Sequence, residues 1–250
     1  MAANHPLCRV AEQSPVVQAI RRYEQDVGHH RVRSQVRQCP RCGCGADRPA
    51  FFRCHETRAR TFLVAVADLV YTVLSVITRW KCGQCRRTFT WYPAFAVPHK
   101  RYVLAVILAR CQAYAERDEQ SYRTGVQDGG KPVFHEQPQG KEITAGSTEE
   151  EKAKERVRAL AHTTLYRWVG TLAAWGHTLR RAWELIKQRH PEAGVLRELA
   201  VFRVAPGKFR SRARGRVVHG CRSLCVTEAV YGELFGVSIF PHLATACGWR

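Results

Sequence analysis

Acidic residues are scarce in this chain of 250 residues, where 21 Asp and Glu stand against 40 Lys and Arg. The formal net charge is +19, while 45% of the residues are hydrophobic. This composition excludes a wholly disordered chain and favours nucleic acid as the partner. Arginine supplies most of the positive charge, and its planar guanidinium suits phosphate and guanine. An anionic membrane surface is the weaker alternative.

Long apolar runs and a secretory signal are also missing. The longest apolar stretch, 62–77, contains Asp68 and falls short of the ~20 residues that span a bilayer. Residues 1–13 are mixed polar, unlike a signal peptide. The cysteines number eleven, an odd count, which together with the missing signal favours a reducing compartment. We therefore expect a cytoplasmic, nucleoid-associated protein with no membrane partner.

Two Cys-x-x-Cys pairs are the most informative motifs in the sequence. Each pair has the spacing of a zinc knuckle, and the stretch between them is long enough for a β-hairpin out and back. Four thiolates from two knuckles form a closed tetrahedral Zn²⁺ site, which stabilises a fold and does no chemistry. We predict one structural zinc ion, bound by Cys39, Cys42, Cys82 and Cys85.

Other interpretations of the cysteines are weaker. A redox pair would not need a second copy and belongs in a βαβ context that this sequence lacks. Cys44, Cys54 and His55 are substitutes for one knuckle thiol, although Cys42 keeps the better spacing. A second metal site is a further alternative with poorer spacing; its candidate ligands are His219, Cys221, Cys225, His242 and Cys247.

The hydrophobic pattern predicts an α+β fold in four parts. These are an N-terminal helix with a basic connector (1–34), a β-rich, four-cysteine zinc ribbon (35–97), a helical helix-turn-helix domain (98–190) and a basic, mainly helical C-terminal region (191–250). Ser14-Pro15 marks the start of the first helix and Gly28 its end. In the ribbon we expect strands over 60–66, 70–80 and 86–92.

The helix-turn-helix domain has less regular sequence signals. Its expected elements are a helix over 98–116, a mobile Gly- and Pro-rich insertion over 123–146, a capped helix over 147–160, a turn at 161–163 and a long helix that ends before Pro191. Thr163 or Thr164 would cap the last helix. Beyond it we expect a helix near 192–202 and one or two apolar helices within 222–247.

The last helix of this domain suits the major groove of DNA. Its inward residues would be Leu165, Trp168 and Val169, and its DNA-facing residues Thr163, Thr164, Tyr166 and Arg167. Two packed helices with no DNA role are the alternative. A heptad stripe on the same helix, formed by Leu165, Leu172, Leu179 and Ile186, suits either a dimer seam or ordinary core packing.

Further basic residues are candidate DNA contacts. Near the second knuckle these are Arg86, Arg87, Lys100 and Arg101. In the C-terminal region they are Lys208, Arg210, Arg212, Arg214 and Arg216. These side chains occupy every second position, so they would share one side of a β-strand or all be free in an extended tail. Such a run neutralises phosphates or is simply a solvated loop.

The segments CPRCG, RWKCGQCRRTFTWYPAFAVPHKRY and TTLYRW carry a resemblance to a known family. Over about residues 35–175 the chain resembles the N-terminal zinc-ribbon and helix-turn-helix region of ISL3-like insertion-sequence transposases. It is more similar still to the stand-alone DUF6431-type proteins of mobile elements. The resemblance implies structural zinc and DNA binding, often at the ends of the element.

Those transposases continue into an RNase H-like domain whose Asp and Glu bind two metals. The chain has five Asp, and none follows Asp128, so we expect no such active site and no enzyme. The sequence thus predicts an accessory protein that binds duplex DNA specifically and recruits a separate transposase or recombinase. A cut-down transposase or nuclease and an RNA-binding ribbon protein are the alternatives, and a homodimer is a candidate assembly.

Overall fold

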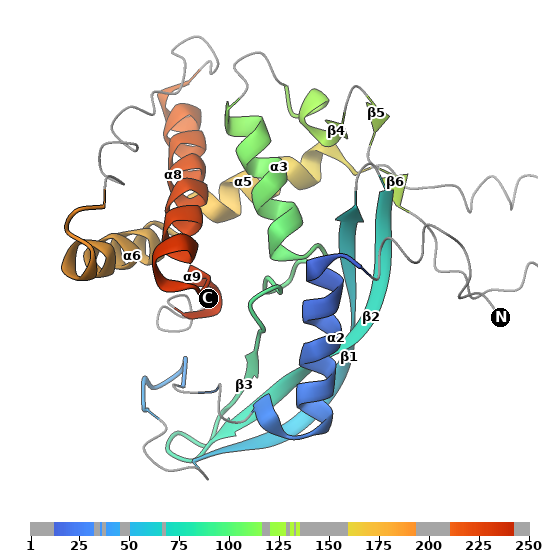
Figure 1. The fold of residues 1–250 in the computed structure, drawn as a ribbon, viewed down its shortest axis with the longest axis vertical. Coiled ribbons are helices and arrows are strands. Elements are labelled where there is room, and N and C mark those ends of the chain that lie inside the picture. Colours follow the sequence, from blue (N-terminus) through green and yellow to red (C-terminus); the bar gives the residue numbers. More distant parts are fainter. Residues whose placement is uncertain are drawn as a thin grey trace, which may run out of the picture.

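A computed structural model describes residues 13–32, 36, 39–45, 51–66, 69–116, 121–128, 131–132, 134–135, 160–193 and 211–242. Within these residues the fold is mixed α+β, as the sequence predicts. A long β-hairpin with one helix along it forms one side of the molecule, and the remaining helices pack around one another on the other side (Figure 1).

The sheet is built on strands β1 (Phe52–Val66) and β2 (Leu69–Cys82), which pair antiparallel over their whole length. A bulge interrupts the register between Cys54 and Glu56. Strand β3 (Thr88–Trp91) pairs antiparallel with the end of β2, and the two-residue β6 (Phe134–His135) pairs parallel with its start. The three predicted strands are present, and both hairpin strands extend further toward the cysteines than their β-branched segments indicated.

Helix α2 (Pro15–Gly28) has the predicted bounds, because proline is accommodated at the first helical position, where its missing N–H costs no hydrogen bond. Its buried face carries Val17, Ile20 and Tyr23. The Tyr23 hydroxyl lies 3.3 Å from the Thr78 hydroxyl on β2, and this hydrogen bond between buried side chains fixes the helix along the hairpin (Figure 1).

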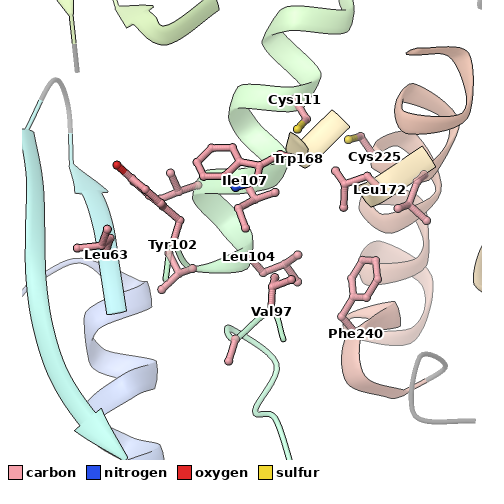
Figure 2. Packing of buried hydrophobic residues seen from close by; sticks show 14 of the residues in the cluster. Leu63, Val97, Tyr102, Leu104, Ile107, Cys111, Trp168, Leu172, Cys225 and Phe240 are labelled. Atoms are coloured by element: carbon pink, nitrogen blue, oxygen red, sulfur yellow. The ribbon is translucent and has the colours of Figure 1, made fainter. Parts of the chain in front are cut away.

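The helical side consists of α3 (Leu104–Glu116), α5 (His162–Ala173), α6 (Gly176–Arg189), α8 (Arg212–Phe235) and the short α9 (Ile239–His242). Figure 2 shows the core between α3, α5 and α8, where Tyr102 meets Trp168 edge to face with ring centroids 4.9 Å apart. Each large side chain buried here contributes about 1.5–3 kcal/mol. The same buried cluster includes Phe62 of β1 and Ile20 of α2, so hairpin and helices share one core.

The predicted helix over 98–116 starts later than expected, at Leu104. Residues 98–99 form a turn instead, and the chain around Tyr102 pairs with β1. The N–H of Leu63 donates to the carbonyl of Arg101, at 2.9 Å, and the N–H of Val103 donates to the carbonyl of Leu63, at 3.1 Å. These two hydrogen bonds replace the first helical turn.

The single long helix predicted up to Pro191 is instead two helices. The first begins at His162 with Ala161 as N-cap, so the predicted turn at 161–163 and the threonine cap are wrong. The chain breaks at residues 174–175, where the ring of Trp175 packs on Phe240 with centroids 4.5 Å apart. The heptad stripe is therefore not one continuous helix face, and its members Leu165, Leu172 and Ile186 are buried within the chain's own core.

The basic run at 208–216 is not a strand or an extended tail where the structure describes it. Helix α8 begins at Arg212, and the hydroxyl of Ser211 caps it by accepting from the N–H of Arg214, at 3.2 Å. Alanine and arginine have high helix propensity, and the Ser N-cap fixes where the helix starts. Lys208 and Arg210 lie outside the residues that the structure describes, as do residues 194–202 and 147–159.

Part of the predicted mobile insertion packs against the core. The 3₁₀ turn η2 (Thr124–Val126) is followed by the two-residue strands β4 (Gln127–Asp128) and β5 (Lys131–Pro132), which pair antiparallel. A Cβ added at the buried Gly125 would lie 2.9 Å from Leu165 Cδ2 and 3.2 Å from Tyr114 Cδ2. Only glycine allows η2 to approach α5 so closely. Residues 136–146 of the insertion lie outside the described part of the chain.

Candidate metal centre and nucleic-acid interface

The first Cys-x-x-Cys pair lies in a tight turn between Cys39 and Cys44. The N–H of Gly43 donates to the carbonyl of Cys39 and the N–H of Cys39 donates to the carbonyl of Cys44, each at 2.9 Å. Gly43 has φ = 72°, a left-handed conformation that glycine adopts without strain. The N–H of Arg41 also points at the Cys39 sulfur, at 3.4 Å, and thus supports negative charge on it.

The second pair repeats this turn residue by residue. The N–H of Arg86 donates to the carbonyl of Cys82, at 3.1 Å, and the N–H of Cys82 donates to the carbonyl of Arg87, at 3.0 Å. Arg86 has φ = 57° and occupies the place of Gly43. In this correspondence Cys82 and Cys85 match Cys39 and Cys42, while Arg87 matches Cys44.

Both turns direct their sulfur atoms to one point. The Sγ atoms of Cys39, Cys42, Cys44 and Cys82 all lie within 4.8 Å of one another and can hold a metal ion. Cys85 lies next to this group, with its Sγ 3.9 Å from that of Cys39. The group of four thus differs from the predicted set, because it contains Cys44 in place of Cys85. The sequence already showed Cys44 beside Cys42, but spacing alone favoured Cys42.

The sulfur–sulfur distances test the fit to a metal. A tetrahedral thiolate site with metal–sulfur bonds of about 2.3 Å has edges of about 3.8 Å. The Cys42–Cys82 distance is 3.8 Å and the Cys39–Cys85 distance 3.9 Å, and both match such an edge. Cys44 lies closer, at 3.1 Å from Cys42 and 3.3 Å from Cys82. Both distances are shorter than such an edge, so the Cys44 sulfur would have to move outward to bind the same ion.

The protein environment affects each thiol differently. Burial raises the pKa of Cys39 to about 12 and also raises that of Cys44. The backbone N–H of Cys44 lowers the pKa of Cys42 to about 6. At Cys82 burial opposes ionisation, but hydrogen bonds, first that of the Cys85 N–H, lower the pKa overall. At Cys42 and Cys82 these shifts favour the thiolate, the form that binds metal.

A small aromatic core lies beneath the cysteines. The rings of Phe52 and Phe89 meet edge to face at 5.6 Å between centroids, and Trp80 is 4% exposed beside them. The N–H of Gly83 donates to the carbonyl of Phe51, at 3.0 Å, and ties the second turn to the start of β1. The hairpin ends and β3 therefore hold the two turns together.

Helix α5 presents the residues that the sequence assigned to DNA. Leu165, Trp168 and Val169 are buried, as predicted from the helical period. Thr163, Tyr166 and Arg167 are exposed on the opposite face, and Thr164 is half-buried at its edge. The anchoring side chains leave the outer face of α5 available to a partner.

Two predicted DNA contacts pack against each other. The guanidinium carbon of Arg214 lies 4.5 Å from the ring centroid of Tyr166 and 4.8 Å from that of Tyr122. Tyr122 also stacks on Tyr114, with centroids 4.3 Å apart. Burial lowers the pKa of Arg214 from its usual value. The rings of two tyrosines therefore hold the guanidinium of Arg214, and contact between Arg214 and DNA stays a prediction.

The other basic candidates occupy separate places. Arg86 and Arg87 are exposed on the second cysteine turn, and Arg212 and Arg216 are exposed on the first turns of α8. Arg101 is exposed before α3, whereas Lys100 is half-buried and its carbonyl accepts a hydrogen bond from Arg60.

The alternative second metal site does not assemble in the described part of the chain. Cys221 and Cys225 lie one turn apart on α8 and are buried in the hydrophobic core. Cys221 interacts with Cys111 of α3, and Figure 2 shows Cys225 on the side of α8 that faces Cys111. His219 is exposed, away from this face. The cluster around Cys39 is the one group of three or more metal-ligating side chains among the residues described. Cys247 lies outside them.

The helices that the structure describes include none that is long and apolar enough to cross a membrane. Comparison of the chain with models of protein families, with curated proteins and with solved structures finds no match. The function proposed below is therefore based on the residues and geometry described above.

Proposed function

We propose that the chain is a zinc-stabilised, sequence-specific DNA-binding protein that serves a mobile genetic element as an accessory factor. Duplex DNA is its ligand, and it recruits a separately encoded transposase or recombinase. The observation that carries the proposal is the outer face of α5. This face presents Thr163, Tyr166 and Arg167 next to the basic start of α8, in a chain of net charge +19.

Zinc is the metal that the all-sulfur donor set suits best, since thiolates select soft or borderline ions. The matching turns support Cys39, Cys42, Cys82 and Cys85 as its ligands, because these four residues hold equivalent places in the two turns. Closed four-thiolate coordination would hold the hairpin ends and β3 together and would supply folding free energy of ~10 kcal/mol or more. No chemistry on DNA is expected from such an ion.

Helix α5 would approach DNA with its first turns. Thr163 and the helix N-terminus suit phosphate oxygens, while Arg167 suits the O6 and N7 of a guanine in the major groove. Exposed Arg212 and Arg216 would contact the backbone and fix the orientation of the protein without specifying sequence. This division of roles predicts both a preferred site and a strong general affinity for duplexes.

The decisive experiment is a selection of bound sequences from random duplex DNA with the zinc-loaded full chain. We expect one enriched motif, competition by duplex DNA far above that by RNA of the same sequence, and no cleavage when Mg²⁺ or Mn²⁺ is added. An RNA preference would instead support an RNA-binding protein, and metal-dependent cleavage a cut-down nuclease. No enrichment with equal binding of all duplexes would reject sequence specificity.

Elemental analysis of the purified protein tests the zinc separately. One zinc per folded chain is expected, and the Cys82→Ser variant should lose both the metal and the folded state of the hairpin ends. A folded chain without zinc, or a Cys82→Ser variant with unchanged metal content and melting, would reject the metal proposal while leaving DNA binding open.

A further inference from the structure

The cysteine cluster contains more thiols than one tetrahedral ion can use. Five sulfurs, those of Cys39, Cys42, Cys44, Cys82 and Cys85, lie within contact distance of at least one other member. A four-coordinate ion binds four of them. One thiol is therefore always left over beside the metal.

The two matching turns identify the additional thiol. Its counterpart in the second turn is Arg87, whose side chain is exposed to solvent. Cys44 instead is half-buried, and its sulfur contacts those of Cys42 and Cys82, at 3.1 and 3.3 Å. Cys44, which follows the left-handed Gly43, thus points into the cluster. Arg87, which follows the left-handed Arg86, points out of it.

Two overlapping sets of four thiols result. One set consists of Cys39, Cys42, Cys82 and Cys85 and has the knuckle spacing; the other exchanges Cys85 for Cys44 and has all four sulfurs within 4.8 Å of one another. Of the three thiols that belong to both sets, Cys39 and Cys82 are buried, at 1% and 0% exposure, and Cys42 is exposed. Cys44 and Cys85 are both half-buried at the rim.

We propose that Cys44 and Cys85 are alternate fourth ligands of the one metal ion held by Cys39, Cys42 and Cys82. This inference rests on the proposed zinc centre. In the exchange, the incoming thiol gives up its proton and forms the sulfur–metal bond, and the outgoing thiolate leaves that bond and takes up a proton. Charge and redox state are conserved, so no oxidant is needed. The centre thereby keeps its ion when a soft electrophile blocks either rim thiol.

Ligand substitution with Co²⁺ as the probe tests the exchange. The full chain is loaded with one Co²⁺, and the thiolate charge-transfer band is compared among wild type, Cys44→Ser, Cys85→Ser and the double variant. Cys54→Ser, an exposed cysteine on β1, is the matched control. We expect both single variants to keep the full band and one ion per chain, and the double variant to lose roughly a quarter of the intensity, one ligand of four.

The outcomes separate the two proposals. Loss of the band in Cys85→Ser alone, with Cys44→Ser unchanged, would show that Cys44 is no ligand, and the reverse pattern would show that Cys85 is none. Either result overturns the exchange while leaving a four-thiolate centre in place. Failure of the wild-type chain to bind Co²⁺ or Zn²⁺ at all would reject the proposed metal centre itself.

Alkylation of the unaltered chain provides a second measurement that no folding defect can disturb. The zinc-loaded protein is treated briefly with iodoacetamide, and peptides containing Cys44 and Cys85 are compared by mass spectrometry. Across the sample we expect some chains to be labelled on Cys44 and others on Cys85. No single chain should carry both labels, and each singly labelled chain should keep its zinc. Label confined to Cys44, or zinc released at the first label, would overturn the proposal.

Discussion

Arg214 of α8 lies over the ring of Tyr166 of α5, with its guanidinium carbon 4.5 Å from the ring centroid. The sequence suggested that each side chain contacts DNA independently. In the structure the arginine instead joins the two helices, and Tyr166 remains 53% exposed above it. A basic residue in the same run as two exposed arginines thus has a structural role that its neighbours lack.

The first prediction concerns the stability that this contact provides. Arg214→Ala should lower the free energy of unfolding by about 1–2 kcal/mol, because it removes a partly desolvated guanidinium from two aromatic rings. Arg212→Ala, at the helix start and exposed, should change it by less than ~0.5 kcal/mol. Urea denaturation of both variants provides the comparison, and equal unfolding free energies would contradict the structural role of Arg214.

The exposed arginines of α8 should affect DNA binding instead. We expect Arg212→Ala together with Arg216→Ala to weaken binding to all duplexes alike and to flatten the slope of log K against log salt by about 2, near 0.9 for each lost phosphate contact. Arg189→Ala, an exposed arginine at the end of α6, is the control. Fluorescence anisotropy at several salt concentrations measures the slope. An unchanged slope would place the start of α8 away from DNA.

Sequence discrimination should depend on Arg167. Arg167→Ala should weaken binding to the preferred site by about 1–3 kcal/mol and relax the preference at one base pair, because a bidentate contact to guanine is lost. Arg180→Ala, exposed on α6, should leave the preference intact. An equal loss on specific and random duplexes would show that Arg167 contacts phosphate only, and no loss on either would remove α5 from the interface.

The sequence predicted those helices and strands that depend on residues close to one another in the chain. Helix α2 follows from Ser14-Pro15 and an apolar stripe, and the β-hairpin follows from β-branched runs on either side of Asp68. The spacing of the cysteines predicted a metal cluster. The spacing could not decide whether Cys44 or Cys85 is the fourth metal ligand, because this depends on the direction in which each turn points its sulfur atom.

Features that depend on distant contacts were not predictable in this way. The break between α5 and α6 accompanies the packing of Trp175 on Phe240, a residue far along the chain. The start of α8 lies in a basic run without an apolar period. Its buried residues, such as Cys221 and Leu224, are on a helix that packs against α3, α5 and α6. Tertiary packing decides both cases.

The two cysteine turns permit a prediction about backbone strain. Arg86 holds a left-handed φ of 57° where Gly43 holds 72°, and a side chain in this region costs about 1–2 kcal/mol. Arg86→Gly should therefore raise the stability of the zinc-loaded chain slightly, by about 0.5–1 kcal/mol after the added flexibility of the unfolded chain is subtracted. Gly43→Ala should lower it by about 1 kcal/mol.

Thermal unfolding in the presence of zinc measures both variants. Arg87→Gly, next to Arg86 but without a left-handed φ, is the control and should lower stability or leave it unchanged. A destabilised Arg86→Gly variant would mean that the side chain of Arg86 contributes contacts worth more than the relieved strain.

The last prediction concerns pH and the half-buried Glu228 of α8. Burial raises the pKa of this carboxyl, although its Oε2 accepts a hydrogen bond from the N–H of Ile239, at 2.9 Å. A carboxyl whose pKa is raised on folding holds its proton more tightly in the folded chain. Its favourable contribution is therefore complete below the usual value of 4.5 and is lost as the pH rises through the raised pKa.

Glu228→Gln keeps an oxygen acceptor for Ile239 and removes the charge. It should therefore stabilise the chain at about pH 8, and the gain should shrink as the pH falls toward about 5. Glu184→Gln, exposed on α6, is the control for the loss of one negative charge. Comparing each variant with wild type at every pH cancels the protonation of the cysteines, which is common to all. A gain that is constant with pH would mean that folding does not shift the pKa of Glu228. A loss at about pH 8 would mean that its charged hydrogen bond to Ile239 outweighs the penalty of burial.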